Sequence, residues 1–193
     1  MLGLVTALRN ARLDAITTFA GASPIIRLYD GTRPATGGAA TTVLSDHACS
    51  ATMAPAAAGG VLTFNAIGSD ASANASSTVS WFRLFKSDGT TIVLDGAAGA
   101  DVITTQTGTA STDTITVGSA TGIVIGQYVS GTGIASGSTV VDIQGTAIHL
   151  SKELTGAASG NATFFWDLRV TPAAVTAGQV VNITALTITD GNA

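Results

Sequence analysis

Charged side chains are scarce in this sequence. Only 10% of its 193 residues are charged, the net charge is −4, and Glu153 is the sole glutamate. Because there is neither a basic patch for phosphates nor an acidic tail, we do not expect nucleic acid as a partner. The 46% hydrophobic content excludes the usual disordered class, which combines low hydrophobicity with high net charge. The chain is therefore expected to fold.

Cysteine and long apolar runs are also nearly absent. Cys49 is the only cysteine, which excludes an intrachain disulfide and a zinc ribbon. Near the N-terminus, Arg9, Arg12 and Asp14 interrupt the apolar residues where a signal peptide needs an unbroken run. No segment reaches the roughly eighteen consecutive apolar residues of a membrane span. We expect a soluble protein without a membrane partner.

The first stretch has the pattern of a short helix. Leu4, Leu8, Ala11 and Ala15 fall at three- and four-residue steps, which predicts that they share one face. Gly21 is expected to end the helix. Such a terminal helix either lies as a strap across the core of its own chain or docks as an arm on a neighbouring subunit.

From residue 25 onward, short β-rich runs alternate with Gly, Pro, Asn and Asp. This pattern is typical of an antiparallel β-sandwich. The strongest local signal is Asp88-Gly89 between two such runs, which predicts a hairpin with a two-residue turn. The runs are IIRLYD (25–30), TTVLSDHACSATM (41–53), VLTFNAI (61–67), STVSWFRLFKS (77–87), TIVLD (91–95), ATFFWDLRV (162–170) and QVVNITALTITD (179–190).

The middle of the chain is richer in Gly, Ser and Thr and nearly free of aromatic residues. Its β-branched runs are cut by glycine every few residues, which suits tight surface hairpins better than strands of a thick core. We therefore predict a mainly β fold, an antiparallel β-sandwich with a short N-terminal helix and an inserted β-hairpin-rich subdomain. Residues 1–100 and 166–193 would form the sandwich, and residues 101–165 the insert, in an expanded surface loop.

The sequence SDHACS holds the densest set of reactive side chains. In a strand, Ser45, His47 and Cys49 would share one face, with Asp46 on the other. His47 and Cys49 could supply two metal ligands, but His149 is the only other histidine, and four-coordinate zinc needs more. The surroundings also lack the strand-to-helix turn that presents a nucleophilic serine. We interpret these residues as structural and assign no catalytic, cofactor-binding or metal residue.

Seven aspartates could in principle supply the paired carboxylates of a glycoside hydrolase. We interpret them as turn residues, as at Asp70, Asp88 and Asp95, which lie beside Gly or Ser, and no Asp-x-Asp-x-Asp-Gly calcium loop is present. The segments GAAGAD and GTGIASGS lack the lysine and the following helix of a phosphate-binding loop. We therefore predict no enzymatic activity and no cofactor. The aspartates are Asp70, Asp88, Asp95, Asp101, Asp113, Asp142 and Asp167.

Two short aromatic clusters are interpreted as one sandwich core, with the alternative that one ring lies at a subunit interface. Their members are Trp81, Phe82, Phe85, Phe164, Phe165 and Trp166. Tyr128 is the only aromatic residue between them within the predicted insert.

Four segments carry a resemblance to a known group of proteins. They are AITTFAGASPIIRLYDGTRPATGGAATTVL, APAAAGGVLTFNAI, VSWFRLFKSDGTTIVLDG and VNITALTITDGNA. Their amino-acid sequences resemble those of small virion-associated proteins encoded in the structural gene clusters of tailed bacteriophages. The resemblance covers about residues 15–100 and 166–193. Residues 101–165 depart from the shorter relatives and are similar instead to Gly-, Thr- and Ser-rich β modules of phage fibres.

The resemblance implies a non-enzymatic structural protein of the virion, assembled in the bacterial cytoplasm. It predicts first a capsid decoration or cement protein. Such a protein would bind the major capsid protein as a homo-oligomer, with a trimer favoured. One alternative is a subunit associated with the tail or its fibres, bound to tail proteins. Another is a module in which the insert binds a host-surface glycan, and exposed Trp or Tyr rings would favour it.

Overall fold

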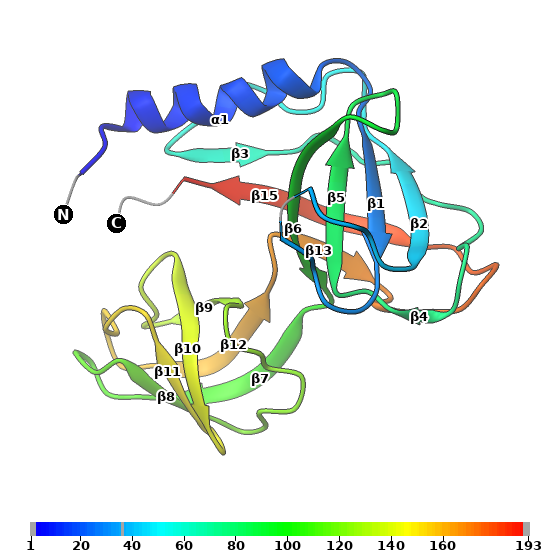
Figure 1. The fold of residues 1–193 in the computed structure, drawn as a ribbon. Helices are drawn as coiled ribbons and strands as arrows, with labels where there is room; N and C mark the ends of the chain where they lie inside the picture. Colours follow the sequence, from blue (N-terminus) through cyan, green and yellow to red (C-terminus); the bar gives the residue numbers. More distant parts are fainter. Residues whose placement is uncertain (1–2, 36, 191–193) are drawn as a thin grey trace. The chain divides into compact units, whose positions relative to one another are not determined.

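The computed structural model describes residues 3–35 and 37–190, and these contain one helix and fifteen strands. The chain divides into two compact units, each with its own apolar core (Figure 1). We call Met1–Ala100 with Asp167–Ala193 the sheet unit, and Asp101–Trp166 the barrel unit. The prediction of a mainly β chain with one short N-terminal helix is confirmed.

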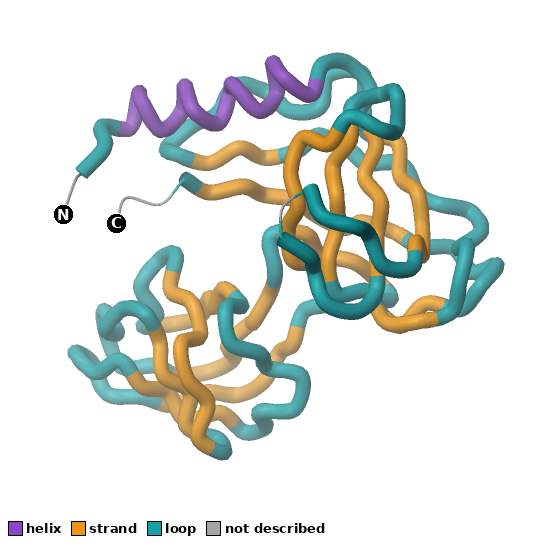
Figure 2. The backbone as a smooth tube through the Cα atoms, viewed as in Figure 1, coloured by secondary structure: helices purple, strands orange, loops and turns teal. Residues whose placement is uncertain are grey.

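The sheet unit is built on one seven-stranded sheet in the order β2-β1-β5-β6-β13-β15-β3, and its strands wrap an apolar core (Figure 2). Neighbouring strands are antiparallel except β6 and β13, which pair in parallel through Ala98 and Leu168. Strands β4 and β14 form a separate small sheet. The elements are α1 (Thr6–Ala20), β1 (Ile25–Tyr29), β2 (Val43–Ala48), β3 (Val61–Thr63), β4 (Ser77–Thr78), β5 (Trp81–Phe85), β6 (Ile92–Gly99), β13 (Leu168–Thr171), β14 (Ala174–Val175) and β15 (Asn182–Thr189).

Strand β5 is buried on both faces of the sheet. Phe82 and Leu84 belong to the main apolar core, whereas Trp81, Arg83 and Phe85 alternate onto the opposite face. All of these side chains are buried, so a second layer must cover the outer face. The segment between β1 and β2 supplies part of that cover, because it bonds to Arg83 through the Gly38 carbonyl.

The apolar face that the spacing predicts for helix α1 lies on its exposed side. Leu13 and Ala20 are buried in the sheet unit's core, whereas Leu8, Ala11 and Ala15 are exposed. The predicted helix, its end and the shared face of Leu8, Ala11 and Ala15 are correct. The apolar stripe that the sequence shows lies on the outside of the helix.

The polar side of α1 holds the helix in place. The Asp14 carboxylate accepts the Ala57 N–H at 2.7 Å, and the Asn10 side-chain oxygen accepts the Gly60 N–H at 2.8 Å. These backbone donors belong to the loop before β3 and would lack a partner if an apolar face packed there. The helix is therefore a strap across its own chain.

The hairpin predicted at Asp88-Gly89 joins β5 and β6, which pair antiparallel. Its loop is longer than the two-residue turn expected, because the Lys86 N–H donates to the Thr91 carbonyl at 2.9 Å. The Asp88 carboxylate accepts the Thr91 hydroxyl and the N–H groups of Thr91 and Thr90. These bonds, led by that of the Thr91 hydroxyl, lower the pKa of Asp88. The aspartate therefore caps the turn, as its sequence context predicts.

The barrel unit closes six strands in the order β10-β11-β8-β7-β12-β9. Its fully buried side chains include Ile115, Ile148 and Phe164, in a core of its own. The segment predicted to form small surface hairpins thus builds a closed barrel, because its sparse β-branched residues converge only on closure. The strands are β7 (Val102–Thr107), β8 (Thr114–Val117), β9 (Tyr128–Thr132), β10 (Ser138–Gln144), β11 (Ala147–Leu150) and β12 (Ser159–Phe165).

Glycine permits the close approach of backbone in this barrel. Gly133 has φ of +79°, and a Cβ there would lie 2.6 Å from the Gly156 carbonyl oxygen and 2.7 Å from that of Ala157. Its own carbonyl accepts the Thr155 N–H at 2.8 Å. A side chain at residue 133 is therefore excluded both by conformation and by contact.

The run ATFFWDLRV, predicted as a single strand, divides into two. β12 ends at Phe165 in the barrel unit, and β13 begins at Leu168 in the sheet unit. The break falls at Trp166 and Asp167, next to residue 165, where the insert is predicted to end.

Deletion of residues 101–166, with a short Gly-Ser linker from Ala100 to Asp167, is expected to leave a folded sheet unit. The pairing of Ala98 with Leu168 brings both junctions together, and the unit retains its own core. We expect a cooperative thermal transition by circular dichroism. Insoluble protein or a broad, non-cooperative melt would show that the barrel unit is needed for the core.

Candidate functional site

The reactive side chains of β2 are buried and bonded to one another. Ser45 Oγ and His47 Nε2 lie 2.9 Å apart, and both residues are 0% exposed. His47 Nδ1 lies 2.9 Å from the Gly68 carbonyl oxygen, which can only accept a proton. Nδ1–H therefore donates to Gly68, and Nε2 accepts the Ser45 hydroxyl. This is the bond direction of a serine nucleophile, but burial keeps any substrate away.

Burial also sets the acid–base behaviour of this strand. It lowers the pKa of His47 below its ordinary value of 6.5, and it raises the pKa of Cys49 to about 12. The imidazole is held neutral and the thiol protonated, so Cys49 lacks the thiolate form that cysteine uses in nucleophilic and metal chemistry. Ser45, His47 and Cys49 are all buried, and Ser45 and His47 bond to each other.

The lowered pKa of His47 predicts acid-dependent stability. The unfolded state binds a proton as the pH falls through 6.5, while the folded state resists it, so stability is lost below that pH at up to about 1.4 kcal/mol per unit. Urea unfolding at pH 7.5 and 5.5 should show this loss in the wild type and a smaller one in His47→Gln. An equal loss in both would place the titrating group elsewhere.

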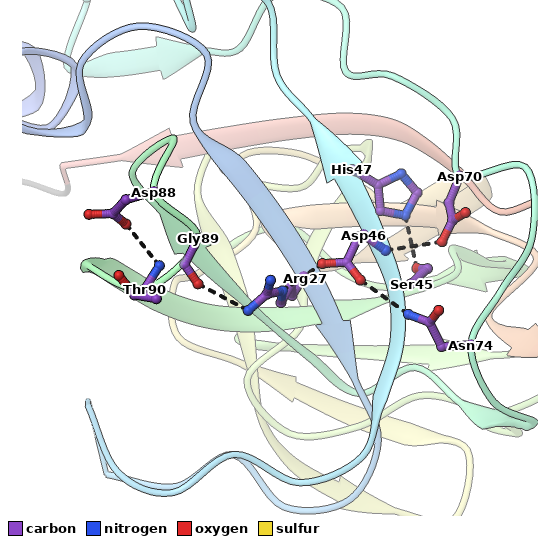
Figure 3. A network of polar contacts seen from close by, with 9 residues as sticks. All are labelled: Arg27, Ser45, Asp46, His47, Asp70, Asn74, Asp88, Gly89 and Thr90. Atoms are coloured by element: carbon purple, nitrogen blue, oxygen red, sulfur yellow. Dashed lines mark hydrogen bonds and ion pairs between the residues drawn. The ribbon is translucent and has the colours of Figure 1, made fainter.

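The neighbouring Asp46 points to the opposite face of β2, as predicted from the strand alternation (Figure 3). Its carboxylate accepts Arg27 Nε at 2.5 Å and the Asn74 side-chain N–H at 3.1 Å. Its backbone N–H donates to the Asp70 carboxylate at 3.0 Å. These bonds tie the loop after β3 to the edge strand β2. The edge is thereby protected against pairing with another strand.

Two aspartates of the barrel unit bond to their neighbours in the chain. Asp113 accepts the Thr114 hydroxyl at 2.8 Å, and Asp142 accepts the Gln144 amide at 2.9 Å, which lowers the Asp142 pKa. Across residues 3–35 and 37–190, no group of three or more His, Cys, Asp or Glu side chains is placed to hold a metal ion.

The strongest polar contact is a buried ion pair on the outer face of the sheet unit. Arg83 donates from Nε and Nη2 to the Asp95 carboxylate at 2.6 and 2.9 Å, with both side chains nearly inaccessible. Nη2 also donates to the Gly38 carbonyl at 3.0 Å, and the Gly37 N–H reaches Asp95 at 3.2 Å. The hydrogen bonds that Arg83 donates to Asp95 raise the pKa of Arg83. The pair fastens the segment between β1 and β2 over the sheet.

Trp81 packs beside this ion pair. Its ring stacks on Tyr29 with centroids 4.1 Å apart, and the Arg83 guanidinium lies 5.3 Å from the Trp81 ring centroid. The indole N–H donates to the Asp30 carbonyl at 2.8 Å. Trp81 therefore holds the segment between β1 and β2, here called the covering segment, and does not belong to the main core.

The expectation of one aromatic core is wrong, because the rings are divided between the units. Phe164 is central to the barrel core, while Phe165 and Trp166 are only half-buried. Phe165 stacks on Tyr128, with ring centroids 5.9 Å apart. Sequence spacing could not pair these rings, since they meet only through the barrel's strand order.

The described surface of the sheet unit carries one apolar stripe on a helix. Val5, Leu8 and Phe19 are 70%, 48% and 52% exposed, and Ala11 and Ala15 lie between them on the outer side of α1. A shallow groove runs beside this stripe. Large apolar side chains gathered on one helix face are typical of a protein contact surface.

Comparisons of this chain with protein-family models, with curated proteins and with solved structures returned no significant match. In the part of the chain that the structure describes, no helix combines the length and the apolar character needed to cross a membrane.

Proposed function

We propose that this chain is a non-enzymatic structural protein of a tailed-bacteriophage virion, which binds the outer capsid surface as a decoration or cement protein. The proposal of a phage protein is motivated by the resemblance of residues 15–100 and 166–193 to the sequences of phage virion-associated proteins. The exposed apolar stripe on α1 is the observation that carries the binding role. The buried state of Ser45, His47 and Cys49 supports a structural rather than a catalytic protein.

The stripe is suited to repeated protein contacts. α1 is fixed to its own chain by polar bonds, including one from Arg9 Nε to the Asp190 carbonyl at 2.6 Å, so its apolar side is presented on a rigid element. Covering the exposed half of Leu8 and of Phe19 would contribute about 1 kcal/mol each, since complete burial of such a side chain contributes about 1.5 to 3 kcal/mol. A modest contact of this size suffices when many copies bind one lattice and each other, with a trimer as the expected assembly.

A location on the tail or its fibres, bound to tail proteins, would use the same surface at fewer copies. Quantitative mass spectrometry of purified virions, referenced to the major capsid protein, separates the two locations. We expect a copy number commensurate with the capsid lattice, in the hundreds. A few dozen copies or fewer would favour the tail, and absence from the particle would overturn both.

Matched variants test the role of the stripe. Leu8→Ser with Phe19→Ser should reduce the copies per virion at least about tenfold, as expected for the loss of two buried apolar anchors. Val180→Ser is the control, because Val180 is equally exposed but lies in the loop before β15. Equal incorporation of both proteins, with unchanged thermal stability, would place the contact elsewhere.

A further inference from the structure

The barrel unit carries an aromatic platform on its outer surface. Antiparallel pairing of β9 and β12 sets Tyr128 directly opposite Phe165, with ring centroids 5.9 Å apart and planes 26° from parallel. Both residues are half-buried, so part of each remains accessible. They line a half-enclosed cavity of about 300 Å³, at the lower end of the range for small-molecule sites.

The turn at residues 134–137 also lines the cavity and is held by hydrogen bonds. Lys152 Nζ donates to the Ser136 carbonyl at 2.9 Å, and Ser138 Oγ donates to the Ala135 carbonyl at 2.8 Å. The Ile134 N–H donates to the Gly131 carbonyl at 3.2 Å. Because these bonds fix the turn before any ligand arrives, little conformational entropy would be lost on binding.

Hydroxyl groups stand at the rim. Ser130 and Ser136 are both exposed, and their side chains make no hydrogen bond to other described residues. Each hydroxyl can donate one hydrogen bond and accept others. None of the described residues that line the cavity carries a charged side chain, which favours a neutral ligand.

We infer that this cavity binds a neutral hexopyranose, as one sugar unit of a glycan. A pyranose presents a face of polarised C–H groups, which the negative face of an aromatic ring attracts, and a periphery of hydroxyls, which serine hydroxyls match. A purely aliphatic ligand would leave the rim hydroxyls unused. This binding activity adds to the proposed structural role and does not depend on which particle surface the sheet unit contacts.

The test is NMR titration of the full ¹⁵N-labelled chain with methyl α-D-glucopyranoside, methyl β-D-galactopyranoside and N-acetylglucosamine. We expect saturable shifts at residues 128–137 and 165 for at least one sugar, with Kd on the order of 1 to 10 mM. Sorbitol, which has the hydroxyls without the ring, should give no saturable shift. Binding by sorbitol alone, or no saturable shift with any pyranose, would overturn the proposal.

Variants locate the site. Phe165→Leu keeps an apolar side chain but removes the ring face, and Ser136→Ala removes one rim hydroxyl. Each should weaken the observed affinity at least about fivefold, with the thermal midpoint measured alongside. Ile103→Ala, at an exposed apolar position on β7 of the same barrel, should leave the affinity unchanged. Wild-type affinity in folded Phe165→Leu would exclude the aromatic platform. Virion copy number is a separate measurement, so either proposal can fail alone.

Discussion

Asp95→Ala is expected to destabilise the protein by about 3 to 5 kcal/mol, because it leaves the buried Arg83 guanidinium without its counter-ion. The carboxylate accepts two Arg83 N–H groups and the Gly37 N–H. Its loss therefore also frees the segment between β1 and β2 from the sheet. Urea unfolding of the purified variant at neutral pH measures the change in free energy.

Two controls separate an uncompensated charge from a simple loss of packing. Arg83→Met with Asp95→Leu removes both charges and should recover most of the stability lost in Asp95→Ala. Arg27→Met breaks the partly exposed pair with Asp46 and should cost less than about 1 kcal/mol. A double variant as unstable as Asp95→Ala would mean that the bonds to the covering segment, rather than the unpaired charge, dominate.

Trp81→Ala is expected to cost about 3 to 5 kcal/mol, because the side chain is 1% exposed and its removal leaves a cavity between Tyr29 and the covering segment. Trp81→Phe should cost less, since it retains a ring against Tyr29 but loses the N–H bond to the Asp30 carbonyl. Thermal and urea unfolding, monitored by far-UV circular dichroism, measure both changes.

Phe19→Ala serves as the exposed aromatic control for Trp81. It should change the free energy of unfolding by no more than about 1 kcal/mol, because its ring lies on the outside of α1 with Lys86 over it. A cost below about 1 kcal/mol for Trp81→Ala would show that the covering segment does not need the ring. Because Arg83 packs over Trp81, Trp81→Ala and Asp95→Ala should not be additive.

The candidate site was only partly predictable. Alternation in β2 correctly set Asp46 apart from Ser45 and His47, because a pleated strand fixes the direction of successive side chains. The hydrogen bond from His47 to the Gly68 carbonyl could not be predicted, since Gly68 lies in a separate loop. The Tyr128–Phe165 platform was hidden for the same reason, as its rings are distant in sequence.

The sequence by itself determined the mainly β class, the N-terminal helix, its end at Gly21 and the hairpin at Asp88-Gly89, because each depends on local backbone preference. Only the tertiary structure decided which side of α1 is buried, that the glycine-rich segment closes a barrel, and that Arg83 meets Asp95 under a covering segment. These outcomes depend on strand order and on the pairing of buried polar groups, which bring together residues that no local pattern connects.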